Sequence, residues 1–321
     1  MTNQQEYPIR PAAYEMIEED EIDLRELWQV IWSGKWTIIF VTFLFAAASV
    51  SYAILQPNQY KSEVLLSPSS SSGGGGLGQM AGLAAMAGIN IGGGGEVDKS
   101  QLALATLQSR DFLTKFINRH QLTVPIFAGK KWDINSGELE LDVEVYDSAN
   151  KKWLREVEAP KKPEPSDWEK FKEFSPMVAV SEDKKTGLIT LSVEFLSPVM
   201  AKQWLELLVK DINLQYQEQD YKKATKNIGY LTKKLKQTSI TDMQNVFFSL
   251  IEEQMKTKML AQLDDEYVFK VIDPAVIPEE KSKPKRALIA VVGTITGGML
   301  GIFLVFILNF SRSDEDEIIK E

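Results

Sequence analysis

The stretch "GTITGGMLG", residues 293–301, places four glycines inside an apolar run of helix length. Glycine costs about 1 kcal/mol relative to alanine in a helix interior. The surrounding run, residues 287–310, holds no charged residue, and a bilayer-spanning helix needs about 20 mostly apolar residues. Because lipid offers the backbone no other hydrogen-bond partner, such a segment forms a helix despite its glycines. We therefore predict a transmembrane helix over residues 287–310.

The glycine spacing inside this helix predicts a close helix contact. Gly293, Gly297 and Gly301 are four residues apart, so they share one face. Two overlapping Gly-x-x-x-Gly pairs allow another helix backbone to approach closely. Chance spacing is the alternative, because glycine is commoner in membrane helices than in soluble ones. If the face is a contact, its partner is another helix of this chain, a neighbouring copy or another membrane protein.

A second uncharged apolar run, residues 36–55, is also long enough to span a bilayer. Ala46, Ser49 and Ala53 form a stripe of small residues along it. A signal peptide is the alternative, because "FAAASVSYA" resembles a cleavage site. The long acidic segment before the run and the length of the run itself argue against a signal peptide. We predict two membrane anchors with both chain ends on the same side.

The overall composition excludes several classes of function. The chain has 321 residues, a net charge of −9 and no cysteine. Such an acidic chain is not expected to bind nucleic acid, and thiol catalysis and cysteine metal sites are ruled out. The lone histidine, His120, has no second histidine with which to share a metal. We expect no catalytic residue, no cofactor and no metal.

The segments next to the first anchor include a short amphipathic helix and a flexible loop. "DEIDLRELWQVIWSGKW" predicts a helix that Asp23 caps and Gly34 ends, with three tryptophans for the membrane interface; packing on protein is the alternative. "YKSEVLLSP" predicts a strand. Residues 69–95, rich in glycine and serine, predict a flexible loop.

The next segments predict a mixed base of helices and strands. Residues 97–122 read as one or two helices, and 138–147 alternate as a strand does. Residues 151–171 are charged and rich in proline, which indicates an exposed excursion. "MVAVSEDKKTGLITLSVEF" predicts a β-hairpin.

A long helix follows the predicted hairpin. Ser197 is a good cap, Pro198 fits the first turn, and nothing but Gly229 interrupts the pattern up to Gln237. A helix of this length would extend about 60 Å. It carries a narrow apolar stripe, here called the arm seam, made of Tyr221, Ala224, Ile228, Leu231 and Leu235.

The arm seam leaves two interpretations open. After a break at "TSITD", a second amphipathic helix runs to about Leu263, and "EYVFKVIDPAVIP" predicts a returning strand. The two helices form either a plain hairpin within one core or a protruding arm whose seam is shared between subunits.

Three stretches resemble the Wzz family of chain-length determinants, also called polysaccharide co-polymerases. They are "IDLRELWQVIWSGKW" before the first anchor, "TGLITLSVEFLSP" before the long helix, and "DPAVIPEEKSKPKRALIAVVGTITGGMLG" at the second anchor. The family's proline-rich and glycine motif maps onto Pro274, Pro278, Pro284, Gly293, Gly297 and Gly301. The proline spacing matches loosely, and the glycine- and serine-rich insertion is not part of the family pattern.

The resemblance implies an α+β membrane protein with two transmembrane helices around a periplasmic α/β base that bears a long helical arm. The expected parts are a cytoplasmic N-terminus with the interfacial helix (1–35), the first transmembrane helix (36–55), the base (56–197), the arm (198–263), a return strand with a proline-rich segment (264–286), the second transmembrane helix (287–310) and a cytoplasmic tail (311–321).

The resemblance also implies the function. Members set the modal length of O-antigen or related glycans as homo-oligomers in the bacterial inner membrane, together with a membrane polymerase and its lipid-linked glycan. One branch carries a fused tyrosine kinase, but this sequence lacks the Gly-x-x-x-x-Gly-Lys signature, so we expect no enzyme. The alternatives are a co-polymerase for capsule, exopolysaccharide or enterobacterial-type common antigen, and, more remotely, an envelope sensor or adaptor.

Overall fold

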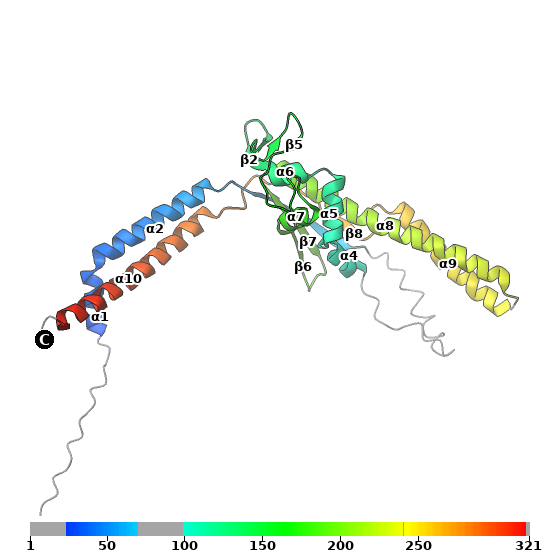
Figure 1. The fold of residues 1–321 in the computed structure, drawn as a ribbon. Coiled ribbons are helices and arrows are strands. Elements are labelled where there is room, and N and C mark those ends of the chain that lie inside the picture. The colour runs from blue at the N-terminus through cyan, green and yellow to red at the C-terminus, as the bar shows by residue number, and fades with distance from the viewer. Residues whose placement is uncertain (1–23, 70–98, 240, 319–321) are drawn as a thin grey trace, which may run out of the picture. The chain divides into compact units, whose positions relative to one another are not determined.

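The computed structural model describes residues 24–69, 99–239 and 241–318 (Figure 1). The chain divides into two compact units, each described here by itself. One unit comprises Met1–Leu55 with Lys285–Glu321, and the other comprises Gln56–Pro284. The predicted cap at Asp23 and nearly all of the predicted loop at 69–95 lie outside the described residues.

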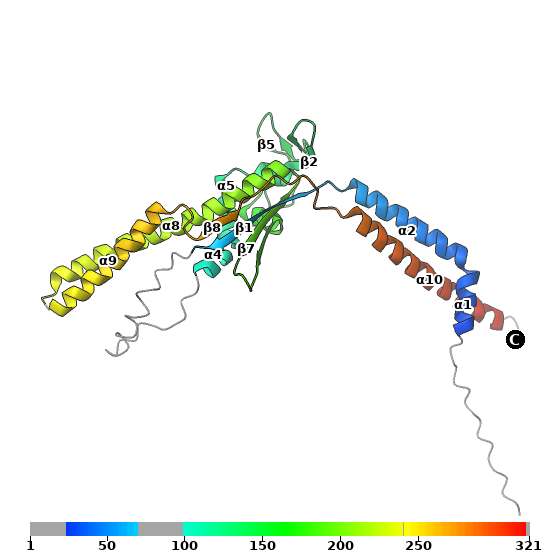
Figure 2. The ribbon, with the colours of Figure 1, turned by 180° about the vertical axis from the view of Figure 1, so that it is seen from behind.

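The described part of the first unit consists of three helices: α1 (Leu24–Ser33), α2 (Lys35–Leu55) and α10 (Arg286–Ile318). Lys35–Leu55 and Arg286–Asn309 are each long and apolar enough to cross a membrane. In Figures 1 and 2, α2 and α10 run side by side along their length. Helix α10 continues to Ile318, past the predicted end of the anchor at residue 310.

Helix α1 presents its aromatic residues to the outside. Trp28 and Trp32 are both exposed, and their rings stack with centroids 6.3 Å apart. The ammonium of Lys35 lies 4.9 Å from the Trp32 ring centroid. Aromatic and basic side chains of this kind are typical of the membrane–water boundary. This helix therefore has the composition of an interfacial helix.

The second unit is built on a four-stranded antiparallel sheet in the order β6-β7-β1-β8. Its strands are β1 (Tyr60–Pro68), β6 (Val178–Glu182), β7 (Ile189–Phe195) and β8 (Phe269–Asp273). The predicted hairpin is confirmed, because β6 pairs with β7 in antiparallel register, Val180 opposite Leu191. The predicted strand at "YKSEVLLSP" is confirmed as β1, which joins the hairpin to β8.

Helices pack on this sheet to form one core. They are α4 (Lys99–Leu107), α5 (Arg110–Arg119), α6 (Thr123–Ala128), α7 (Asp167–Phe174), a 3-10 turn η1 (Ser175–Met177) and the first half of α8 (Pro198–Gln237). Trp204 of α8 is only 1% exposed, and its ring lies 4.3 Å from that of Phe195 and 5.8 Å from that of Phe174. These rings join the sheet to the helices.

One sequence prediction in the base is wrong. The single strand predicted over 138–147 is two strands in separate small sheets, β3 (Glu138–Leu141) with β2 (Gly129–Asp133), and β4 (Tyr146–Asp147) with β5 (Lys152–Trp153). Asp142 causes the break, because its carboxylate accepts a hydrogen bond from the Glu144 N–H and closes a turn.

The predicted exposed excursion over 151–171 is confirmed for most of its residues, but its last part is helical. It contributes α7, which starts with a capping box between Ser166 and Glu169. The last residue of α7, Phe174, is completely buried. The apolar residues of this helix are three positions apart (Trp168, Phe171 and Phe174) and too few to stand out from its charged surroundings, so no pattern in the sequence indicated the helix.

The predicted long helix is confirmed as α8, whose cap Ser197 accepts a hydrogen bond from the Met200 N–H. After the predicted break, α9 (Thr241–Leu263) returns along α8. In Figures 1 and 2 the second half of α8 and α9 lie side by side and form a two-helix arm. Strand β8 then brings the chain back into the sheet.

Candidate functional site

The closest helix contact in the first unit involves the glycine face of α10. Gly293, Gly297 and Gly301 all face α2, and Gly297 and Gly301 are buried although most of α10 is exposed. The two helices run antiparallel, so Gly293 meets Ser49 near one end and Gly301 meets Ile38 near the other. The sequence left the partner of this face open, and in the structure it is the first anchor of the same chain.

A methyl group on these glycines has no room. A Cβ on Gly297 would lie 2.6 Å from Phe45 Cβ, and one on Gly301 would lie 3.0 Å from Ile38 Cα. A Cβ on Gly293 would overlap Ser49. The neighbouring Gly298 differs, because the nearest atom to its added Cβ is Thr42 Oγ1 at 3.8 Å. Three of the four glycines are therefore needed for the close approach, and the fourth is not.

Sequence reasoning missed two contacts at the ends of this helix pair. Gly34, read only as the end of α1, lies where a Cβ would overlap Val305 of α10. At the other end, Arg286 Nε donates a hydrogen bond to the backbone oxygen of Ala53, at 3.1 Å. The sequence gives no signal for the first contact, because the residues four positions either side of Gly34 are Val30 and Ile38, which complete no small–xxx–small pair.

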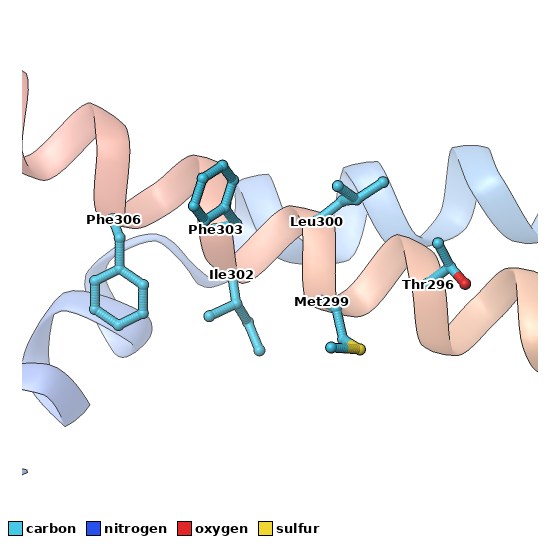
Figure 3. Close-up of a pocket in the computed structure, with 6 residues that line it drawn as sticks. All are labelled: Thr296, Met299, Leu300, Ile302, Phe303 and Phe306. Carbon is cyan, nitrogen blue, oxygen red and sulfur yellow. The ribbon is translucent and has the colours of Figure 1, made fainter.

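The outer face of α10 carries a shallow apolar pocket. It is lined by Thr296, Met299, Leu300, Ile302, Phe303 and Phe306. Figure 3 shows Met299 and Ile302 projecting from α10 on the side away from the α2 ribbon. The hydroxyl of Thr296 donates to the Val292 oxygen of the same helix, so the surface offers mainly apolar contact and suits lipid or another membrane helix. It is separate from the glycine face.

The prolines of the motif lie in the other unit, in a segment that hydrogen-bonds to residues at the start of β1. Pro274 is exposed, Pro278 half-buried and Pro284 buried, all in an extended segment after β8. Around them, the Gln59 N–H donates to the Lys283 oxygen at 2.9 Å, and the Ser62 hydroxyl donates to the Val276 oxygen at 2.8 Å. Proline favours extended backbone, which suits this return path. The prolines and glycines of the motif thus belong to different units.

The arm seam faces α9 of the same chain. Ala224 is buried, while Tyr221, Ile228, Leu231 and Leu235 are half-buried. Lys258 of α9 lies over the Tyr221 ring at 5.0 Å, and Leu235 shares a groove with Phe248 and Ile251 of α9. The hairpin interpretation therefore accounts for the seam's contacts, and a role between subunits stays a prediction.

The base holds the root of the arm through buried polar contacts that sequence reasoning missed. Asn213 of α8 is buried; its carbonyl accepts hydrogen bonds from the Val268 and Phe269 N–H groups, at 2.8 and 2.9 Å. Its amide donates to the Phe269 oxygen at 3.0 Å. A lone asparagine inside a polar helix gives no signal of this kind. These hydrogen bonds fix the return strand, β8, to α8.

Titratable groups in the base also make structural contacts. His120 Nε2 lies 3.0 Å from Asp211 Oδ2, which also pairs with Arg119 at 3.1 Å. Burial and the Asp220 carboxylate raise the pKa of Tyr267 well above its ordinary value, so this hydroxyl stays protonated and donates to Asp220. Within the described ranges, no cluster of three histidine, aspartate or glutamate residues could hold a metal ion.

Comparisons with known proteins identify relatives of two stretches. Residues 20–120 match the family model described as "Chain length determinant protein", named Wzz. Residues 240–310 match a second family model, "G-rich domain on putative tyrosine kinase". No curated protein matches the sequence significantly. Among solved structures, a "full-length bacterial polysaccharide co-polymerase" matches at 16% identity, over 91% of this chain and 99% of that one. The TM-score of this match is 0.36.

Proposed function

We propose that this chain, which belongs to the Wzz family of chain length determinant proteins, sets the modal length of the O-antigen of lipopolysaccharide. Length regulation of a polysaccharide is the family's role. We also propose that the regulated glycan is O-antigen, that the chain forms an oligomeric scaffold, and that its partner is a membrane polymerase. We infer that the chain acts without catalysing a reaction, by holding the polymerase and its growing glycan.

The observation that carries the proposal is the glycine-packed pair of α2 and α10. Its three tight glycine contacts hold the two anchors close along their length, and the described part of the unit has no cluster of three histidine, aspartate or glutamate residues that could hold a metal ion. Close packing of this kind suits a scaffold, because close backbone contacts fix helices in one arrangement. The apolar pocket at Met299, Ile302 and Phe306 remains available to a polymerase helix.

We further propose the location and the partners. Both anchors lie in the bacterial inner membrane, and residues 56–286, with the sheet and the arm, lie in the periplasm, where lipid-linked glycan is extended. The working form is a homo-oligomer. A periplasmic reporter enzyme fused within residues 69–95 should be active; activity for fusions at the C-terminal tail alone would reverse this topology.

A co-polymerase for capsule, exopolysaccharide or a common antigen is the second candidate. Deletion of the gene separates the two, because only the glycan that the protein regulates should change its length distribution. We expect the O-antigen ladder on a gel to lose its modal cluster while other glycans keep theirs. A changed capsule with an unchanged O-antigen ladder would favour the second candidate.

A further inference from the structure

The outer face of the arm carries an unbroken run of positive charge. Between Tyr221 and Gln237 the chain has six lysines and no acidic residue, although the whole chain has a net charge of −9. The lysines are 222, 223, 226, 233, 234 and 236, here called the arm lysine face, and all six are exposed. They extend over about 21 Å of helix.

The geometry of α8 places this face opposite α9. At about 100° per residue, the six lysines cover about 160° of the helix surface, centred on the side away from the arm seam. The seam contacts α9, so the lysines face outward. Lys222 pairs with Glu218, but in the described part of the chain no carboxylate lies within ion-pair distance of the other five.

A general need for solubility does not account for this face. Solubility is served by interspersed charges of both signs, whereas a field of one sign attracts ions of the other. Lysines three or four residues apart repel each other, as Lys222 with Lys226 and Lys233 with Lys236, at a small cost to the helix. The face is therefore arranged for an anionic partner.

Two observations favour a polymer of acidic sugars over an anionic lipid surface. A basic helix that binds a membrane inserts its apolar face, and here that face is covered by α9. Tyr230 also lies in the lysine row, 61% exposed, with Lys234 5.7 Å from its ring centroid. An exposed ring between charges offers a flat apolar surface for a sugar ring. Gly229 beside it has open space, so a chain can approach the backbone.

We propose that the arm lysine face binds an anionic polysaccharide along its length, several charged sugars at a time. The proposal rests on the proposed function, because it names the glycan surface of the same protein. Several weak contacts in a row let a growing chain remain attached yet slide, since the loss of any one contact costs little. Binding should weaken steeply with added salt.

The test uses the full chain in phosphatidylcholine nanodiscs, with polygalacturonate as the acidic probe and dextran as the neutral one. The variant combines Lys223→Gln, Lys226→Gln, Lys233→Gln and Lys236→Gln. The control removes the same charge from exposed lysines elsewhere in the same unit, by Lys161→Gln, Lys162→Gln, Lys184→Gln and Lys185→Gln. Glutamine keeps helix propensity close to that of lysine, so circular dichroism should be unchanged.

We expect wild type and control to bind polygalacturonate and ignore dextran, with the arm variant at least about tenfold weaker at low salt. Equal binding by all three proteins, or equal loss in the control, overturns the proposal. Stronger binding to phosphatidylglycerol vesicles than to polygalacturonate would reassign the face to lipid. A changed subunit number with unchanged polygalacturonate binding would reassign it to a contact between copies. The deletion ladder tests the proposed function separately, because it does not depend on these lysines.

Discussion

Gly297 of α10 lies directly against Phe45 of α2, so that an added Cβ would come within 2.6 Å of Phe45 Cβ and 3.2 Å of Thr42 Cα. Both neighbours are held within a helix, so neither can move aside without changing the helix pair. One hydrogen atom in place of a side chain therefore sets the distance between the two anchors.

Gly297→Leu should change function without preventing membrane insertion. Leucine is apolar enough for the anchor to insert, but its bulk forces α10 away from α2. We expect normal protein level and a glycan ladder with a shifted or lost modal length. Gly298→Leu is the matched control, because its Cβ has 3.8 Å to the nearest atom. Equal damage from both substitutions at matched expression would show that the tight contact has no role.

A charge in the arm seam should weaken the arm. Ile228 is half-buried in the seam on the side of α9, so Ile228→Glu should cost about 1–3 kcal/mol of hairpin stability and weaken assembly with it. Thr225→Glu, exposed on the same helix, is the control. Limited proteolysis of the arm and the subunit number in detergent are the measurements. An Ile228→Glu protein as resistant and as oligomeric as wild type would contradict both expectations.

Removing the buried amide of Asn213 should loosen the base. Asn213→Leu removes the side-chain partner of two buried N–H groups and one carbonyl oxygen, which should cost about 2–5 kcal/mol. Asn227→Leu, which loses one half-buried bond to Gln254, should cost less. Thermal melts of both variants provide the comparison. Similar midpoints for the two would mean that the Asn213 contacts do not stabilise β8.

Acid should destabilise the second unit partly through Glu169. Its carboxylate accepts a hydrogen bond from the Ser166 N–H and pairs with Arg155, and these contacts hold its pKa below the ordinary value of 4.5. A depressed folded-state pKa gives stability that is present above the unfolded-state pKa and is lost as the pH falls through the folded-state pKa.

Glu169→Gln tests this dependence. The variant should be less stable than wild type near neutral pH, and the difference between their thermal midpoints should shrink as the pH falls below about 4. A difference that stays constant down to about pH 3 would show that ionisation of Glu169 contributes nothing.

The sequence predicted those features that depend on neighbours along the chain. The start of α8 at Ser197 and Pro198 and the β6–β7 hairpin both follow from local spacing and turn residues. The glycine face was visible for the same reason, since its spacing is a property of one helix. Its partner was not, because Gly297 and Phe45 are far apart in the sequence.

The errors and omissions share a cause. The sheet order β6-β7-β1-β8 joins strands from both ends of the unit, and no local pattern specifies such pairing. The break at Asp142 depends on one side-chain hydrogen bond, and the buried role of Asn213 depends on strand β8, 56 residues later. Tertiary contacts determine each of these features, so the local sequence could not predict them.

The most direct test of the central claim is the glycan ladder of a strain without the gene, with wild-type protein then supplied from a controlled promoter. We expect a random length distribution without the protein and a return of one modal cluster when it is supplied. Total glycan should change little, because the protein sets the length of the chains and not the amount that is synthesised. An unchanged ladder without the gene, or glycan that disappears altogether, would contradict a role in setting chain length.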